Sequence, residues 1–423
     1  MKVVVEEQHD LPLVEVQVVS RCGPAADPEG QEGLARHAFE LLRRGAGGRS
    51  RAELDAAFDQ LGAQIETVPS HDGVGMSATC LERNLEAVLA LLGDVVLRPH
   101  LEEDEHLRLL REDLAGLDEI RDDDASLCSR FFDRLALAGG PYGRSSLGSD
   151  ASLGAIGRAD SAAWAEQAMT SDNLLVGLAG HVDPARAAEL AAKTFAALPA
   201  GGVPPPSPLW TPPARGRLIF LVDKPERAQS QILIGHPAPP PAHQDFLALH
   251  VACTAFGGTF TSRLMREVRV KRGWSYGVGF RAARSRGGHS FRLRVFPAAE
   301  QTPDTLALVL GMWEEVVTDG LSDEEVEHAR SYLEGSWAFE IDTPGERLDR
   351  RVETELLGLP SDHVATYLPR LRAVDATTVN AALRRHWRPS EATVVCTATA
   401  AEMRPRVEPL GLGDIDVVDY MSY

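Results

Sequence analysis

The stretch GLARHAFELLRRGAGG, residues 33–48, holds the residues whose types and spacing come nearest to metal chemistry. His37 and Glu40 are three apart, so on a helix they share one face and could offer a metal an imidazole nitrogen and a carboxylate oxygen. A second histidine would be needed at position 41, where Leu41 stands. One imidazole and one carboxylate rarely make a catalytic zinc site, and the sequence has no His-x-x-x-His or His-Glu-x-x-His. We therefore expect no metal in this chain.

The same stretch offers an ion pair in place of a metal. Arg36 and Glu40 are four residues apart and oppositely charged, which on a helix surface contributes roughly 0.2–0.5 kcal/mol. Arg36 keeps its proton at any physiological pH, so it cannot serve as a ligand.

The composition is that of a globular protein without a membrane span. The 423 residues are 44% hydrophobic and 25% charged, and no run reaches the roughly 18 apolar residues that a span needs. The length allows about two or three domains. The start, MKVVVEEQHD, has neither the basic nor the apolar region of a secretory signal, so the sequence predicts a cytoplasmic location.

Charge and cysteine content argue against two further kinds of function, nucleic-acid binding and a cysteine-based metal or redox site. The formal net charge of −19 argues against a nucleic-acid partner, because phosphate contacts need clustered Lys and Arg. If a peptide is bound, the acidic balance favours a basic one, and the alternative is a charge that only keeps the protein in solution. The five cysteines lie far apart without a Cys-x-x-Cys pair, which predicts buried free thiols.

A Pro/Gly-rich stretch divides the chain. In LPAGGVPPPSPLWTPP, residues 198–213, proline and glycine prevent a helix or a central strand from continuing. We predict a linker here, between an N-terminal domain over 1–197 and a C-terminal domain over 214–423.

Both parts show the same order of elements. In LVEVQVV the valines at 14, 16 and 18 alternate, which predicts a half-buried strand. Helices are expected at about 33–44, 51–61 and 83–97, and a closing strand at 173–180. The second part has strands at 217–223 and 230–236, a helix at about 244–256, two strands within 274–296, helices within 301–340 and a strand at 392–398. The pattern predicts an α+β protein with two related units, each a mainly antiparallel sheet with helices on one face.

Three stretches together resemble the insulinase/pitrilysin peptidase family, in its branch of half-size chains that includes the mitochondrial processing peptidase subunits. They are ADPEGQEGLARHAFELLRRGAGGRSRAELDAAFDQLGAQIE, GGTFTSRLMREVRVKRGWSYGVG at 257–279 and GLSDEEVEHARSYLEGSW at 320–337. The resemblance covers nearly the whole chain in order. It implies two αβ-roll domains that form half of a clam-shell chamber, with the other half from a second chain.

The family's catalytic helix carries His-x-x-Glu-His, in which two imidazoles bind zinc and the glutamate activates water. The resemblance places Arg36 at the first ligand, Phe39 at the base and Glu40 at the second ligand, and none of the three can do that work. Glu119 falls near the family's third ligand, but without the histidines we expect only a solvated helical acid. The resemblance thus implies a degenerate motif here and zinc in a partner subunit.

The family's second signature is retained. Arg269 and Tyr276, seven apart in REVRVKRGWSY, match an Arg and a Tyr that contact the substrate backbone and the oxyanion. Both can donate hydrogen bonds to a carbonyl oxygen that gains negative charge. The alternatives are that Arg269 is one of several surface cations and that Tyr276 is a core aromatic residue of a strand. Gly257 and Gly258 are expected to permit a tight turn, with substrate contact as the alternative.

The resemblance and these residues predict the zinc-free subunit of a heterodimeric metalloendopeptidase, inactive alone, that cleaves extended or leader peptides. A homologous zinc-binding partner would carry the complete motif, and this chain would supply Arg269 and Tyr276. Two alternatives stay open. One is a non-catalytic structural or peptide-binding subunit of an assembly, and the other is a self-sufficient homodimeric peptidase with an unusual metal site.

Overall fold

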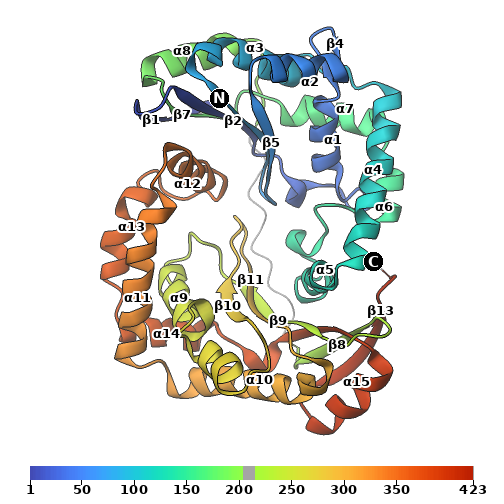
Figure 1. Cartoon of the computed structure of the whole chain (residues 1–423), viewed down its shortest axis with the longest axis vertical. Coiled ribbons are helices and arrows are strands. Elements are labelled where there is room, and N and C mark those ends of the chain that lie inside the picture. Colours follow the sequence, from blue (N-terminus) through green and yellow to red (C-terminus); the bar gives the residue numbers. More distant parts are fainter. Residues whose placement is uncertain (203–214, 423) are drawn as a thin grey trace. The chain divides into compact units, whose positions relative to one another are not determined.

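The computed structural model of this protein describes residues 1–202 and 215–422, which form two units with one large sheet each (Figure 1). The described part of the first unit comes from residues 1–117, 145–202 and 338–364, and that of the second from residues 118–144, 215–337 and 365–422. Most of the predicted linker at 198–213 lies outside the described residues, so the predicted domain boundaries stay a prediction.

The sheet of the first unit has the strand order β1-β7-β2-β6-β5. Its strands are β1 (Lys2–Glu7), β2 (Leu13–Ser20), β5 (Gln64–Pro69), β6 (Val74–Leu81) and β7 (Leu174–Gly180). Only β1 and β7 pair in parallel. The alternating valines of β2 are fully buried, as predicted, but the strand is not half-buried, because Gln17 and Val19 on its other face are buried too.

Helices of the first unit form a core against one face of this sheet. They are α1 (Leu34–Leu42), α2 (Arg51–Gln60), α3 (Leu85–Leu97), α7 (Arg158–Ala168) and α8 (Pro184–Thr194), with α4 (Glu103–Asp122) and α6 (Asp150–Ala155) beside them. A capping box between Ser50 and Glu53 fixes the start of α2, as that residue pattern favours. A two-stranded ribbon, β3 (Gly45–Ala46) with β4 (Arg49–Ser50), joins α1 to α2.

The sheet of the second unit has the order β10-β11-β9-β12-β8-β13. Its strands are β8 (Leu218–Asp223), β9 (Gln231–Ala238), β10 (Val278–Ala282), β11 (His289–Val295), β12 (Thr393–Ala398) and β13 (Asp414–Asp419). Apart from β13, the order and directions of these strands repeat those of the first sheet. The predicted recurrence of one element order is therefore confirmed.

An aromatic core lies under the helices of the second unit. The helices are α9 (Phe246–Cys253), α10 (Thr302–Asp319), α11 (Asp323–Trp337), α14 (Ala376–His386) and α15 (Ala400–Val407). Helix α13 (His363–Arg372) also belongs to this unit from Ala365 onward. Two π-helical segments, η4 (Thr254–Gly258) and η5 (Met265–Lys271), lead toward β10. Phe280, Phe291, Trp313 and Trp387 pack with ring centroids 4.9–6.2 Å apart, the range that aromatic pairs prefer.

One helix from each half of the sequence packs against the sheet built by the other half. Helix α12 (Pro344–Leu356) covers the second face of the first sheet, and α5 (Asp124–Ala136) does the same for the second sheet (Figure 1). Gly177 of β7 allows this approach, because a Cβ there would lie 2.7 Å from Leu348 of α12. The α+β class and the mainly antiparallel sheets are confirmed, but helices cover both faces of each sheet and not one.

Other sequence expectations have simple outcomes. None of the five cysteines is in a disulfide, and all but the half-buried Cys22 are buried, which agrees with the predicted thiols. Burial raises the pKa of Cys128 to about 12, so its thiol is inert. No helix in the described ranges is both long enough and apolar enough to cross a bilayer.

Candidate functional site

Arg36 of α1 lies between two carboxylates. The first turn of α1 is fixed by Asp27, whose carboxylate accepts hydrogen bonds from the backbone of Gly33 and Ala35 at 2.9 and 3.0 Å. The guanidinium donates to Glu40 one turn later at 3.4 Å and also to Asp113 of α4, whose side chain is only 4% exposed. The expected ion pair with Glu40 is thus present, and a second helix supplies another carboxylate.

Phe39 is a core residue. Its side chain is 2% exposed and packs edge-on against Trp164 of α7, with ring centroids 6.5 Å apart. A hydrocarbon ring at this place cannot act as a base, and it keeps water away from this face of α1.

His37 is fully buried and both of its ring nitrogens have protein partners. Nδ1 lies 2.7 Å from Oδ2 of Asp113, and Nε2 lies 3.0 Å from Nδ1 of His106. Burial is the main reason that the pKa of His106 is lowered. Glu40 bonds to Arg36 and not toward His37, so the two residues do not form the half-site that their spacing allows.

Sequence reasoning missed Asp113 and considered Glu119. Glu119 is exposed on α4, as expected of a solvated acid, whereas Asp113 faces inward. A signal was available, because Leu109, Asp113 and Leu117 are four residues apart and form the buried stripe of α4. An acid inside such a stripe predicts a buried partner.

The residues of this site do not fit a zinc ion. A guanidinium occupies the space between the two carboxylates, and neither nitrogen of the buried imidazole is free. Among the described residues, one other group has metal-binding types close together, formed by His243, Asp245 and His386. There Asp245 already accepts hydrogen bonds from His386 and from Arg385, so the Arg385 guanidinium balances its charge.

Arg269 and Tyr276 lie against each other in the second unit. Arg269 is near the end of η5, and Tyr276 is in the turn that precedes β10. The guanidinium carbon lies 4.6 Å from the centroid of the Tyr276 ring and 5.4 Å from that of Phe260. The rings are 79% and 77% exposed, so the interpretation of Tyr276 as a core residue is wrong.

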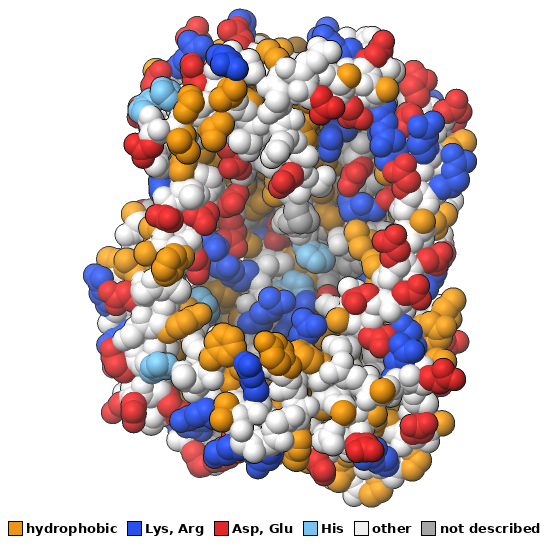
Figure 2. All heavy atoms as spheres, in the orientation of Figure 1, with side chains coloured by type: hydrophobic (Ala, Val, Ile, Leu, Met, Phe, Trp, Pro, Cys, Tyr) orange, Lys and Arg blue, Asp and Glu red, His pale blue; other side chains and the backbone are white. Residues whose placement is uncertain are grey.

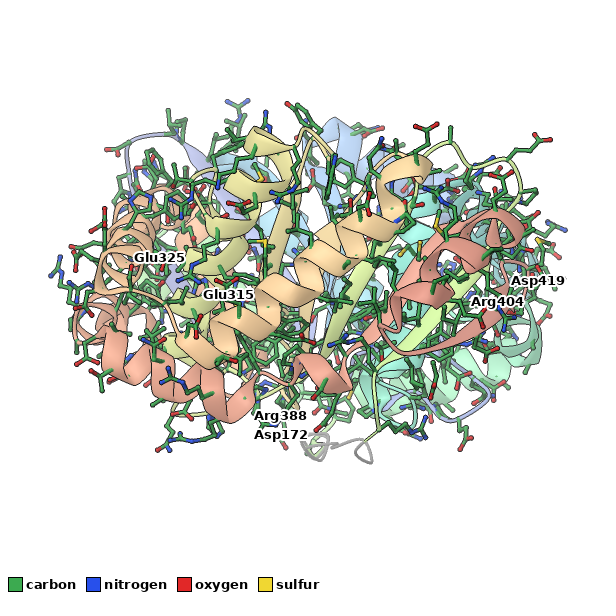
Figure 3. The ribbon with its side chains drawn as sticks, turned by 90° about the horizontal axis from the view of Figure 1, so that it is seen from below. Asp172, Glu315, Glu325, Arg388, Arg404 and Asp419 are labelled. Carbon is green, nitrogen blue, oxygen red and sulfur yellow. The ribbon has the colours of Figure 1, made fainter. Side chains whose placement is uncertain are left out.

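Arg269 differs from the other cations of its segment. Glu325 of α11, which is labelled in Figure 3, pairs with Arg263 and Arg266, while Lys271 and Arg272 pair with Glu267. Arg269 forms no ion pair with any carboxylate in the described ranges. Its positive charge is therefore available to a ligand, and the aromatic rings hold it in place by cation–π contacts.

The turn that carries Tyr276 is fixed by hydrogen bonds. The backbone N–H of Gly273 donates to Arg269 and that of Trp274 to Val268, each at 3.1 Å. The hydroxyl of Ser275 then donates to the carbonyl oxygen of Gly277 at 2.7 Å. These contacts bring two residues seven positions apart in the chain onto one surface.

Gly257 and Gly258 have a packing role that differs from the one predicted. Neither has the positive φ that a glycine-dependent turn needs. A Cβ on Gly257 would lie 2.6 Å from the backbone nitrogen of Phe280, so the glycine lets η4 approach β10 closely. Both glycines border a cavity of about 490 Å³ whose wall includes β10.

The comparisons with known proteins point to one peptidase family over most of the chain. Residues 2–147 match a family model described as insulinase, peptidase family M16, and residues 155–333 match one described as the peptidase M16 inactive domain. An uncharacterized zinc protease of Mycobacterium tuberculosis is 26% identical over 83% of this chain and 81% of its own length. A protein of Helicobacter pylori named non-peptidase homolog YmxG is 21% identical over 91% and 88%.

A solved structure has the same fold. The peptidase M16 inactive domain from Pseudomonas fluorescens superposes with a TM-score of 0.86 and covers 93% of this chain and 94% of its own. At 23% sequence identity this likeness concerns the fold alone.

Proposed function

Because this chain belongs to the insulinase family of peptidases, M16, we propose that it is the zinc-free subunit of a heterodimeric metalloendopeptidase. A homologous partner carries the metal, and this chain supplies Arg269 and Tyr276. The chain is inactive by itself and active as part of the pair.

One observation carries this proposal, namely the state of Arg269. A segment with five cations pairs four of them with carboxylates and leaves Arg269 against two exposed aromatic rings. An unpaired guanidinium with restricted freedom loses little entropy when it binds a carbonyl oxygen. A purely structural role does not require this arrangement.

The chemistry that these two residues perform is electrostatic. The Arg269 guanidinium and the Tyr276 hydroxyl both donate hydrogen bonds to the scissile carbonyl oxygen, and these bonds strengthen as the oxygen gains negative charge. Removal of one such donor typically lowers kcat by about 10²–10³-fold.

The substrate is an extended peptide, such as a leader segment. Strand β10 is at the edge of its sheet and, among the described strands, pairs with β11 alone, so its other side can accept a further strand. Main-chain pairing of this kind reads the backbone more than the side chains. Tyr276 comes two residues before β10, which brings the two donors close to a peptide bound at this edge.

The arrangement at α1 supports the need for a partner. By the resemblance, Arg36, Phe39 and Glu40 fall at the positions where the family holds zinc and its base, and their side chains cannot replace those residues. The self-sufficient homodimer would need a metal site of its own, and the engaged nitrogens of His37 give it no support.

The test uses the assembled pair, made by coexpression with a homologous chain that has His-x-x-Glu-His. Arg269→Ala and Tyr276→Phe are compared with Arg266→Ala, an exposed cation of the same segment with only a 3.8 Å pairing. We expect kcat to fall about 10²–10³-fold for the first two variants and less than about twofold for the control. Unchanged cleavage by Arg269→Ala and Tyr276→Phe would contradict the assigned role.

A second candidate is a non-catalytic structural or peptide-binding subunit. The name of the Helicobacter pylori relative, a non-peptidase homolog, favours it. It predicts that copurification yields an assembly without a zinc-bearing homologue. Peptide binding without cleavage, in every assembly isolated, would support this candidate over the first.

A further inference from the structure

The 490 Å³ cavity beside the edge strand β10 has a basic wall. It is bordered by the first two turns of α5, the end of η4, β10, β11 and the residue that follows β11. All these elements belong to the second unit. Lys and Arg side chains gather over this part of the molecule in Figure 2.

The strand register explains the shape of the cavity. Gly277, Gly279 and Arg281 share one face of β10, because side chains alternate along a strand. Gly279 lies opposite Arg294 of β11, and Arg281 lies opposite Arg292. The floor of the cavity therefore has no side chain at Gly279, while the ring of Phe296 packs at Gly277, and three guanidiniums stand next to this floor on the same face.

These arginines differ in their partners. Arg292 donates to the Ser290 hydroxyl at 2.9 Å and to the carboxylate of Asp133 on α5. Arg281 and Arg294 form no ion pair with any carboxylate in the part of the chain that the structure describes. Like charges directly opposite each other on two strands are destabilising, so an anion that enters the cavity removes this repulsion.

Two acids of the second unit, Asp123 and Asp133, interact with the arginines of the cavity. Asp133 is bound to Arg292, and Asp123 accepts a hydrogen bond from the backbone of Ser126 at 2.7 Å and so caps α5. Hydrogen bonds with the side chain and then the backbone of Ser126 are the main reasons that the pKa of Asp123 is lowered, with a smaller contribution from Arg294. Asp133 also attracts Arg281, and Asp123 attracts Arg294, but in the described ranges neither acid forms an ion pair with that arginine.

We propose that Arg281 and Arg294 bind the carboxylate of an acidic residue in the peptide that this chain holds. This inference rests on the proposed function, because the cavity begins at Gly277, directly after Tyr276. Guanidinium groups suit carboxylates, which they can bind through two parallel hydrogen bonds. The site selects acidic peptides, although the net charge of −19 by itself favours basic ones.

Binding of two fluorescent extended peptides to the full chain tests the inference. The peptides are identical except for one position, which is Glu in the first and Gln in the second. The double variant Arg281→Gln/Arg294→Gln is compared with Arg266→Gln/Arg404→Gln. This control removes the same charge from an exposed position on η5 and from Arg404 of α15, which Figure 3 labels. Arg292 is left unchanged because its loss would leave the buried Asp133 unpaired.

We expect the wild type to bind the Glu peptide about tenfold more tightly than the Gln peptide. In the cavity variant this preference falls below about twofold while the Gln peptide binds as before, and the control variant keeps the preference. A preference that survives in the cavity variant, or equal binding of both peptides by the wild type, overturns this inference and leaves the proposed function intact. Absence of binding to either peptide overturns both.

Inorganic phosphate distinguishes a peptide subsite from a site for free anions. We expect it to displace the Glu peptide only at concentrations far above the dissociation constant of that peptide. Phosphate that binds as tightly as the Glu peptide, and that requires Arg281 and Arg294, would overturn the assignment to a peptide carboxylate.

Discussion

The guanidinium carbon of Arg269 lies 4.6 Å from the ring centroid of Tyr276, and the tyrosine ring is 79% exposed. The ring face holds the cation, while the hydroxyl at the ring's far end stays accessible. The two residues therefore form one surface with two donors, although they belong to different elements.

This contact predicts different effects for two substitutions of Tyr276. Tyr276→Phe keeps the stacked ring and removes one donor, so kcat of the assembled pair should fall about 10²–10³-fold with little change in KM. Tyr276→Ala also frees Arg269, so KM should rise as well. Because the residue is exposed, the unfolding free energy should change by less than about 0.5 kcal/mol in both variants. Steady-state kinetics and urea unfolding check this, and identical kinetics of the two variants would contradict it.

Arg36 should contribute to stability through Asp113. Arg36→Met removes a donor from a carboxylate that is only 4% exposed, so we expect a loss of roughly 1–3 kcal/mol in unfolding free energy. Arg404→Met provides the control, because its pair with Glu408 is 3.8 Å long and exposed. Urea denaturation of the two variants measures the difference. Equal stability of Arg36→Met and wild type would mean that Asp113 needs only His37.

The isolated chain should hold little zinc. We expect elemental analysis of untagged protein, after zinc loading and desalting, to give well below one zinc per chain, because the imidazole and carboxylates of α1 are engaged with protein groups. His37→Ala should change stability and not metal content. One tightly bound zinc that disappears in His37→Ala would instead make this chain a peptidase in its own right.

His236 should make the second unit sensitive to acid. Its ring is buried between Trp313 and Phe291, and burial lowers its pKa to about 4 from an ordinary value near 6.5. Below pH 6.5 the His236 ring binds a proton in the unfolded chain, whereas in the folded chain it binds one only when the pH falls to about 4. Stability from this group is therefore complete above pH 6.5 and is lost as the pH falls toward 4, by roughly 2 kcal/mol between pH 7.5 and 5.

Urea unfolding at several pH values tests this prediction. The loss of unfolding free energy between pH 7.5 and 5 should be smaller in His236→Gln, because glutamine does not titrate. The glutamine side chain can still accept the hydrogen bond that the backbone N–H of Arg388 donates to Nε2 at 2.9 Å. The other carboxylates and histidines titrate in both proteins. The difference between the two plots of unfolding free energy against pH therefore gives the contribution of His236. Parallel slopes would show that the ring takes up its proton normally.

Local patterns were enough to predict much of the fold. The alternating valines of β2, the spacing in α3 and the repeated order of strands and helices all depend on near neighbours in the chain. The burial of the second face of β2 could not be predicted in this way. It depends on α12, which joins that sheet from more than 300 residues away.

The candidate site also has features that the sequence predicts and features that only the tertiary structure shows. Residue types alone showed that Arg36, Phe39 and Glu40 cannot form the family's zinc site. The ability of a side chain to bind a metal depends first on its chemical type, which the sequence gives directly. The partner of Arg36, the stacking of Arg269 on Tyr276 and the arginines beside the glycine floor of β10 required tertiary structure. Such contacts depend on register and on packing between distant segments, which fix where each side chain points and which charges stay without a partner.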